Sequence, residues 1–304
     1  MVNDLVRDIQ ELKKQRNAIL LAHNYQVQAV QEMADIRGDS FELAKAARKV
    51  DQRTIVFCGV YFMAESAYML NPDKTVLIPD KTAGCDLADT ITEEQLAALK
   101  ARHPGVPVAC YINSSAGIKA LSDVCVTSAN ALRIIEKLPQ DKVIFIPDKN
   151  LAHYVQRSTN KQIIRWPGSC YVHDELTVRQ IKAAKEEHPG APVLAHPECG
   201  PGVIDCADHV FSTSGMLRFA KAYTGPQSCM IICTERGMLF PLKQANARLR
   251  YVFPSDKLTC RTMKQITPAK VRQALVAMQH TVRVPDGTMR KARVALENMM
   301  DLGR

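Results

Sequence analysis

Short apolar runs alternate with longer amphipathic stretches along the first third of the chain. Each run spans four or five residues and precedes a turn-prone segment, whereas each amphipathic stretch carries apolar residues at helical spacing. The pattern predicts strands at 18–22, 54–58 and 75–78 and helices near 41–49, 62–70 and 93–102. Thr92 followed by Gln95 is a capping-box pattern, and Thr267 before Pro268 marks another helix start. Buried strands between amphipathic helices indicate an α/β fold with parallel sheets covered on both faces.

The same order of elements recurs along the chain. The hexapeptide at 103–108 returns with one substitution at 188–193, an offset of 85 positions. Polar motifs that begin at Ala34, Ser122 and Ala207 keep offsets of 88 and 85 residues. Any α/β protein alternates similar elements, and that simpler reading stays open, but shared offsets favour true repetition. We predict three analogous small αβα domains at 1–104, 105–190 and 191–304, the last ending in a helix near 280–304.

Composition narrows the class of protein. The 304 residues include 46% hydrophobic and 23% charged residues, which is typical of a soluble globular protein. No stretch approaches the roughly 20 apolar residues of a membrane helix, and the charged start resembles no signal peptide, so we expect a cytoplasmic protein without membrane contact. The net charge of +9 suits small anions, because Lys and Arg are scattered and we expect no nucleic-acid partner.

Polar side chains follow the first strand of each predicted copy. They are His23 and Tyr25, Tyr111 and Asn113, and His196 and Glu198. Ligands of parallel α/β units bind at the carboxyl ends of strands, so we expect these side chains to share one site. A single His or Tyr at a strand end is commonly only a structural hydrogen-bonding group.

Hydroxyl groups stand at or just before a helix start in each copy, at Ser40, Ser128 and Thr213. Free N–H groups and the helix dipole make such a position suitable for anions. Taken singly, each hydroxyl is explained as an N-cap. Together, three of them suit a substrate with several carboxylates or a phosphate.

One cysteine per copy follows the proline at the end of the third strand: Cys85, Cys170 and Cys260. The ten cysteines contain no Cys-x-x-Cys pair, and we expect those within apolar strands to be inert core thiols. Three converging thiolates could bind zinc or three corners of a 4Fe-4S cluster with one open iron. Cys199 with Cys206 is an alternative metal or redox pair.

Long motifs resemble the quinolinate synthase family. They run from about residue 19 to 261 and include His23-Asn24-Tyr25, Gly38-Asp39-Ser40, Tyr111-Ile112-Asn113-Ser114-Ser115-Ala116, Val126-Thr127-Ser128, Gly168-Ser169-Cys170-Tyr171-Val172-His173, His196-Pro197-Glu198-Cys199, Ser212-Thr213-Ser214-Gly215-Met216 and Thr234-Glu235-Arg236-Gly237. The resemblance implies three α/β domains around a pseudo-threefold axis. It also implies condensation of iminoaspartate with dihydroxyacetone phosphate to quinolinate, phosphate and water in de novo NAD biosynthesis. An L-aspartate oxidase or dehydrogenase is then a candidate partner that supplies iminoaspartate.

The resemblance also implies roles for individual residues. Cys85, Cys170 and Cys260 correspond to ligands of a 4Fe-4S cluster whose open iron acts as a Lewis acid in dehydration. Substrate-binding and catalytic positions carry over to His23, Tyr25, Ser40, Tyr111, Asn113, Ser128, His196, Glu198, Ser212 and Thr213. Glu198 and Tyr25 are the candidates for acid–base work, His23 and Tyr111 would assist by hydrogen bonds, and His196 would orient the substrate.

Three other interpretations remain. Without the family, the same features fit an oxygen-sensitive hydro-lyase acting on a small di- or tricarboxylate. The positive charge alone favours an iron–sulfur sensor or nucleic-acid binder, for which the sequence shows no reading motif. A three-thiolate zinc enzyme is the third, and metal analysis separates it from the others.

Overall fold

The computed structural model describes residues 2–303 and contains three four-stranded parallel sheets, each covered by helices. The first unit holds β1 (Ala18–His23), β2 (Ile36–Gly38), β3 (Thr54–Cys58), β4 (Thr75–Leu77), α1 (Val2–Gln15), α2 (Gln28–Met33), α3 (Ser40–Lys49), α4 (Tyr61–Leu70) and η1 (Ala88–Thr90). The second holds α5 (Glu93–Arg102), β5 (Val108–Tyr111), β6 (Val124–Val126), β7 (Lys142–Ile146), β8 (Gln162–Arg165), α6 (Ala116–Ala120), α7 (Ala131–Lys137), α8 (Lys149–Gln156) and α9 (Tyr171–Asp174), and α10 (Val178–Glu187) then packs on the third sheet.

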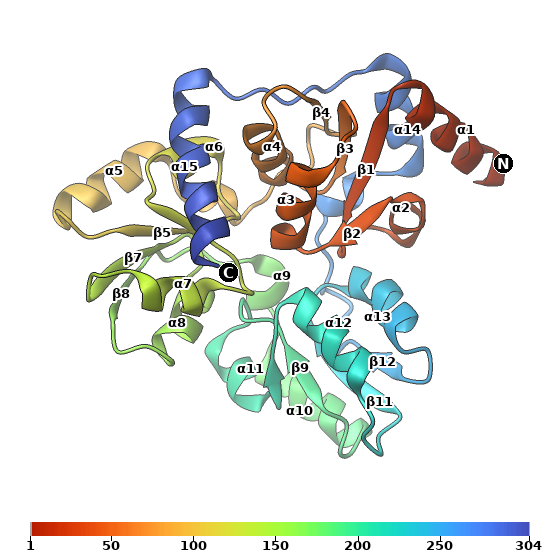
Figure 1. Cartoon of the computed structure of the whole chain (residues 1–304). Helices are drawn as coiled ribbons and strands as arrows, with labels where there is room; N and C mark the ends of the chain where they lie inside the picture. The colour runs from red at the N-terminus through yellow and green to blue at the C-terminus, as the bar shows by residue number, and fades with distance from the viewer. Residues whose placement is uncertain (1, 304) are drawn as a thin grey trace.

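The third unit completes the set. It holds β9 (Val193–Ala195), β10 (His209–Val210), β11 (Cys229–Cys233), β12 (Arg250–Val252), α11 (Pro201–Cys206), α12 (Thr213–Ala222), η2 (Arg236–Met238) and α13 (Leu239–Ala245). The chain then forms η3 (Met263–Gln265), α14 (Pro268–Ala277) and α15 (Asp286–Leu302). Figure 1 shows the three units arranged around a common centre.

The sheets have equivalent topologies. Their strand orders are β2-β1-β3-β4, β6-β5-β7-β8 and β10-β9-β11-β12, so the first strand of each unit is always central. This equivalence confirms the predicted α/β fold with three analogous layered domains. One element of each unit escaped the sequence pattern, because β2, β6 and β10 are only two or three residues long and give no recognisable periodicity.

Helix starts follow the local sequence. The Thr92 side chain accepts a hydrogen bond from Gln95 N–H while the Gln95 side chain accepts from Thr92 N–H, which confirms the predicted capping box. Thr267 caps α14 by accepting from Lys270 N–H, with Pro268 in the first turn. These caps satisfy N–H groups that have no partner inside the helix.

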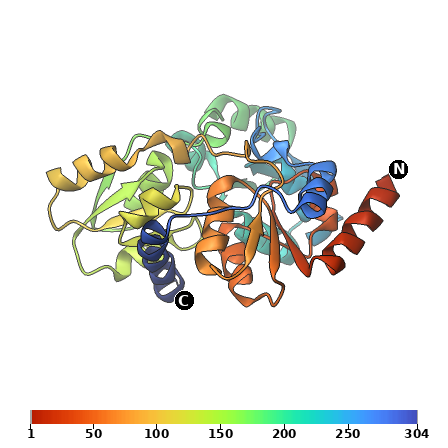
Figure 2. The same cartoon turned by 90° about the horizontal axis from the view of Figure 1, so that it is seen from above.

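The two last helices pack on the first and second units. α14 lies against α1 and β3, whereas α15 packs on α6, β6 and α4, as Figures 1 and 2 show. One continuous apolar core therefore runs through the first two units, while the third has separate clusters of its own. The domain boundaries after residues 104 and 190 stay a prediction.

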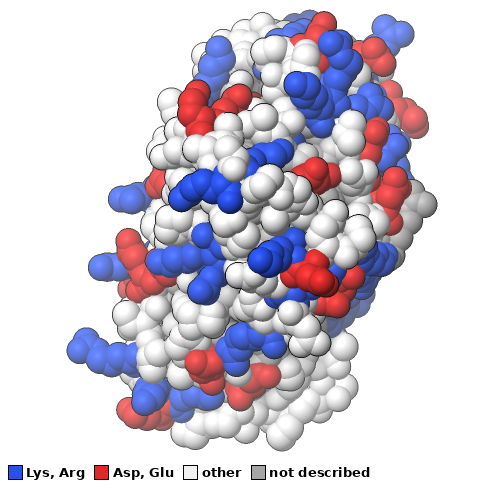
Figure 3. All heavy atoms as spheres, turned by 90° about the vertical axis from the view of Figure 1, so that its left-hand side faces the viewer, with Lys and Arg blue, Asp and Glu red and all other residues white. Residues whose placement is uncertain are grey.

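The distribution of charged side chains and the lengths of the helices are relevant to the expected absence of nucleic-acid and membrane partners. Figure 3 shows Lys and Arg interspersed with Asp and Glu on the face to the left of Figure 1. Within residues 2–303, no helix has the length and apolar character needed to cross a bilayer.

Candidate active site

A cavity lies where the three units meet, and the predicted residues line it from all three sides. Those that line it are His23, Tyr25, Ser40, Cys85, Tyr111, Asn113, Ser128, Cys170, His196, Glu198, Thr213 and Cys260. The parallel sheets explain this convergence, because β1, β5 and β9 point their carboxyl ends toward the common centre. Ser212 is the exception among the predicted residues. Its hydroxyl accepts a hydrogen bond from Gly215 N–H and caps α12 next to the cavity.

Glu198 is the hub of the polar groups. One carboxylate oxygen accepts a short hydrogen bond from the Tyr111 hydroxyl, and the other lies 2.9 Å from Nδ1 of His173. Burial alone would raise the pKa of Glu198, but the hydrogen bonds and the neighbouring His173 and His196 rings lower it. Glu198 is therefore an ionised carboxylate held by donors in a buried site.

His173 continues this network on its other side. Nε2 lies 2.9 Å from the Thr234 hydroxyl, which lies 2.6 Å from the Tyr25 hydroxyl. A neutral His173 that carries its proton on Nδ1 satisfies both neighbours, since Nδ1 donates to Glu198 and Nε2 accepts from Thr234. In this series two hydroxyls, those of Tyr25 and Thr234, lead to a base, His173, which the Glu198 carboxylate orients.

Burial acts differently on the other titratable groups. Burial, and then the charge of Lys264, lowers the pKa of His23 to about 3, and burial lowers that of His196 to about 3 as well. Both imidazoles are thus neutral near pH 7. Burial and the nearby Glu198 charge raise the pKa of Tyr25 and of Tyr111 well above the usual value, so both phenols keep their protons.

The ring nitrogens of His23 and His196 have defined roles. Tyr25 N–H donates to Nδ1 of His23 at 3.2 Å, which places the proton of the neutral ring on Nε2. Likewise Glu198 N–H lies 3.4 Å from Nδ1 of His196, whose Nε2 lies 3.2 Å from the Ser128 hydroxyl. His196 also stacks on His173, with ring centroids 4.8 Å apart.

Two of the three hydroxyls lie at a helix start, as predicted. Ser40 and Thr213 are the first residues of ten-residue helices, α3 and α12. Ser128 instead precedes α7 by three positions and bonds His196. None of the three is the N-cap, because Asp39, Asn130 and Ser212 occupy that position. Their hydroxyls are therefore not used up in capping.

The cysteine set fits a group bound by three thiolates. Cys85, Cys170 and Cys260 each come from a loop after the last strand of a sheet and line the same cavity, which none of the other seven cysteines lines. Burial raises the pKa of all three thiols, and for Cys170 the charges of Glu198 and the other two add to it. This mutual destabilisation is what a cationic iron or zinc centre relieves.

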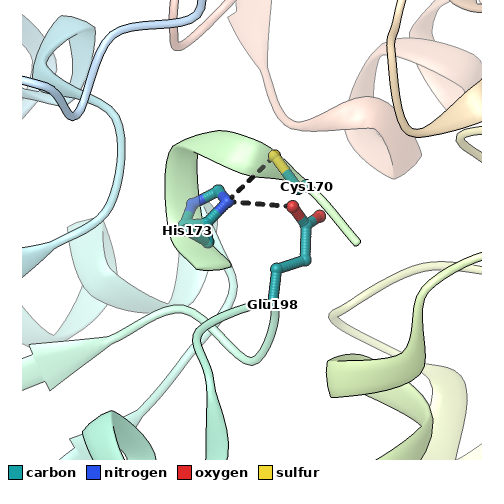
Figure 4. A group of neighbouring side chains, drawn as sticks. All are labelled: Cys170, His173 and Glu198. Atoms are coloured by element: carbon teal, nitrogen blue, oxygen red, sulfur yellow. Dashed lines mark hydrogen bonds and ion pairs between the residues drawn. The ribbon is translucent and has the colours of Figure 1, made fainter. Parts of the chain in front are cut away.

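A second donor set shares Cys170. Figure 4 shows the His173 ring beside both Cys170 and Glu198, and donor atoms of these three residues lie within 4.8 Å of one another. Such a mixed sulfur, nitrogen and oxygen set suits a single ion. The alternative pair lies elsewhere, since Cys199 Sγ donates to Cys233 O and neither Cys199 nor Cys206 lines the cavity.

Two glycines near the cysteines behave differently. A Cβ on Gly168 would lie 2.3 Å from Oγ1 of Thr90 and 2.6 Å from Pro147 O, so close packing requires glycine there. A Cβ on Gly84 would meet nothing nearer than 4.0 Å. Met63 forms part of the cavity wall with Val60 and Phe62.

Sequence reasoning missed two members of the network, His173 and Thr234. Thr234 directly follows β11. A search for polar residues at the carboxyl ends of all strands, and not only of the first strand of each copy, would therefore have found it. His173 lies one turn after Cys170 in the short helix α9, and the corresponding positions after Cys85 and Cys260 hold Ala88 and Met263 instead of histidine. Only the fold brings it next to Glu198.

Comparison with known proteins places the chain in a family. Residues 7–301 match the family model of quinolinate synthetase A protein. The chain belongs to this family. It is 50% identical to quinolinate synthase of Methanoregula boonei over 98% of both chains, 49% identical to that of Thermodesulfovibrio yellowstonii over 99% of both, and 46% identical to that of Pyrococcus furiosus over 99% of both. Members of the quinolinate synthetase A family are enzymes, and the cavity is the candidate active site.

Proposed function

We propose that the protein is a quinolinate synthase of NAD biosynthesis that condenses iminoaspartate with dihydroxyacetone phosphate to quinolinate, phosphate and water. The observation that carries the proposal is the chain of contacts from Tyr25 through Thr234 and His173 to Glu198 in the cavity that also collects three thiols. The reaction needs proton transfers at carbon and oxygen, which such a network supports.

Cys85, Cys170 and Cys260 would hold the 4Fe-4S cluster. One thiol from each unit matches a cluster with three protein ligands. When bound, its fourth iron supplies a Lewis acid for removal of a hydroxyl group. All remaining roles fall to side chains of the cavity.

The substrates are held by their anionic groups. Ser40 and Thr213 offer hydroxyls at the starts of α3 and α12. The helix dipole at the start of α12 favours phosphate or carboxylate, whereas at α3 the Asp39 carboxylate already accepts from Phe41 and Glu42 N–H. Ser128 and His196 form a second polar pair. Oδ1 of Asn113 is buried and has no hydrogen-bond partner within residues 2–303, so it is available to accept from the substrate amine.

The Tyr25 network moves the proton. As the Tyr25 oxygen takes a proton from substrate carbon, its own proton passes to Thr234 Oγ1 and the Thr234 proton passes to Nε2 of His173. The imidazolium that forms is stabilised by the Glu198 carboxylate, 2.9 Å away. Tyr25 never becomes a free phenolate, which is compatible with its raised pKa. The reverse transfers return the proton and complete an aldose–ketose shift.

The proposal includes the source of iminoaspartate and the cellular compartment of the protein. Iminoaspartate hydrolyses readily because it is an imine, so we expect an L-aspartate oxidase or dehydrogenase to provide it nearby. All ten cysteines are free thiols, which supports a reducing compartment such as the cytoplasm.

Metal analysis and activity test the proposal together. We expect about four iron and four sulfide per chain in anaerobically prepared protein, and quinolinate from dihydroxyacetone phosphate and iminoaspartate generated in the assay. Cys260→Ala should lose iron and activity, whereas the control Cys206→Ala, outside the cavity, should keep both. Zinc in place of iron would instead indicate a zinc site, on the three thiols or on the mixed set of Cys170, His173 and Glu198.

A further inference from the structure

A buried ion pair lies behind the active site and connects residues from the first and third units. Nζ of Lys264 lies 2.9 Å from Oε1 of Glu235 and also donates to the backbone carbonyl of Tyr25. The Glu235 side chain is fully buried, and that of Lys264 is 24% exposed. A pair in this setting is costly to bury unless its geometry is fixed by further hydrogen bonds.

Those further bonds are present. Glu235 Oε1 accepts from Cys260 N–H at 3.1 Å, and Oε2 accepts from Gly237 N–H at 2.6 Å. Neither carboxylate oxygen is left without a donor. The ammonium of Lys264 and the carboxylate of Glu235 thus hold the backbone on both sides, at Tyr25 and at Cys260.

The surrounding backbone is close-packed at the same place. Gln26 Nε2 donates to Met263 O at 3.0 Å, and a Cβ on Gly237 would lie 2.7 Å from the Tyr25 carbonyl group. Thr234, whose hydroxyl bonds that of Tyr25 at 2.6 Å, is the residue before Glu235. The ion pair is therefore the charged centre of the contact that brings the Tyr25 loop to Thr234.

We propose that Lys264 is a positioning residue that, through Glu235, fixes both the Tyr25–Thr234 hydrogen bond and the loop that carries Cys260. The part of the inference that concerns the Tyr25–Thr234 hydrogen bond rests on the proposed function, whereas the part that concerns the Cys260 loop does not. Lys264 contacts no reacting atom in this view. It sets the distance across the boundary between the first and third units on which the proton relay depends.

The central variant is Lys264→Met, which keeps the length of the side chain and removes the ammonium. Misplacement of a reacting group by about 1 Å costs about 100-fold in rate, so we expect kcat to fall about 10-fold to 100-fold with KM changed less than about threefold. Lys264→Arg should restore part of the loss, because it can still bond both the carboxylate and the carbonyl.

Lys270→Met is the matched control. Nζ of Lys270 also bonds one carboxylate, that of Asp80 at 2.5 Å, and one carbonyl, that of Gln265 at 2.9 Å. The substitution removes the same charge and the same number of hydrogen bonds from a lysine whose partners, Asp80 and Gln265, are not hydrogen-bonded to Tyr25 or Cys260. We expect kcat of this variant to match that of the unaltered protein.

A second readout does not depend on activity. In metal-free protein, peptide-resolved alkylation by iodoacetamide depends on both the accessibility and the thiolate fraction of each thiol. Loss of the Lys264 charge disfavours the Cys260 thiolate, so faster alkylation in Lys264→Met reports greater accessibility. Lys264→Met should speed alkylation of Cys260 several-fold and leave Cys85 unchanged, and Glu235→Gln should act in the same direction. Circular dichroism establishes that each variant is folded, and Glu235→Gln replaces Lys264→Met if the latter is not.

The outcomes separate the claims. An unchanged kcat in Lys264→Met overturns the role toward Tyr25, and an unchanged Cys260 rate overturns the role toward the ligand loop. Equal losses of kcat in Lys264→Met and Lys270→Met also overturn the first role, since they reduce it to general destabilisation. If the unaltered protein makes no quinolinate, the proposed function fails, while the alkylation rates still decide the loop.

Discussion

Replacement of Glu198 by Gln removes the charge at the centre of the active-site network with little change in shape. The carboxylate is 3% exposed and accepts from Tyr111 and from His173 Nδ1. An amide accepts with only one of its two polar atoms. With its oxygen toward His173, its NH₂ group turns the Tyr111 hydroxyl into an acceptor, and with its NH₂ group toward His173, the ring must carry its proton on Nε2 and cannot accept from Thr234. In either orientation the neutral amide no longer stabilises the imidazolium that the relay forms.

The expected magnitude follows from these two losses. Acid–base catalysis contributes about 10²- to 10⁴-fold, and at about 1.4 kcal/mol per factor of ten this corresponds to about 3 to 5 kcal/mol of transition-state stabilisation. We expect kcat to fall within that range. Stability should fall at neutral pH, because the lowered pKa of Glu198 means that its partners stabilise the carboxylate by more than burial destabilises it.

Quinolinate formation under substrate saturation, measured beside iron content, provides the assay. Glu65→Gln is the control, because that carboxylate accepts from Ala116 N–H at 3.1 Å and does not line the cavity. Iron should be unchanged in both variants. Activity of Glu198→Gln within threefold of the Glu65→Gln value would refute the assigned role of the carboxylate.

Three further predictions use other parts of the structure. Thr234→Val should lower kcat about 100-fold while Thr234→Ser stays near the unaltered rate, and equal rates for the two would remove Thr234 from the relay. The pKa values of His23 and His196 fall from 6.5 to about 3 on folding, so the unfolded state binds more protons between these pH values. The melting temperature should therefore drop as the pH falls from 6.5 toward 3. The double variant with Gln at both positions should flatten this dependence. Gly168→Ala should destabilise the protein by about 1 to 3 kcal/mol in urea titrations, and Gly84→Ala should change stability by less than about 0.5 kcal/mol, since only the first added methyl meets neighbouring atoms.

Much of the fold is readable in the sequence because several strands are continuous buried apolar runs. The apolar runs at 54–58 and 18–22 coincide with β3 and β1, apart from one added residue in β1. The strands β2 and β10 could not be found in this way, since Ile36–Gly38 and His209–Val210 are too short and only partly buried. Their pairing is fixed by tertiary contacts with β1 and β9.

Some residues of the candidate site could likewise be predicted from the repeat pattern, and others could not. Residues at equivalent strand ends, such as Tyr111 and Glu198, could be placed together because parallel strands of related units end at the same edge. His173 could not, because the corresponding positions, three residues after Cys85 and Cys260, hold Ala88 and Met263, so the repeat gives no polar pattern there. Its contact with Glu198 depends on how the second unit docks on the third.

Burial is the common cause of the chemical differences within the cavity. The same low-dielectric surroundings keep the phenol of Tyr25 protonated and the imidazole of His196 neutral, because each of these groups is uncharged in its preferred state. Glu198 stays ionised only because donors from Tyr111 and His173 replace the lost water. A single carboxylate therefore carries the negative charge at the centre of this network, and a proton displaced along the relay is stabilised at the one imidazole that bonds it directly.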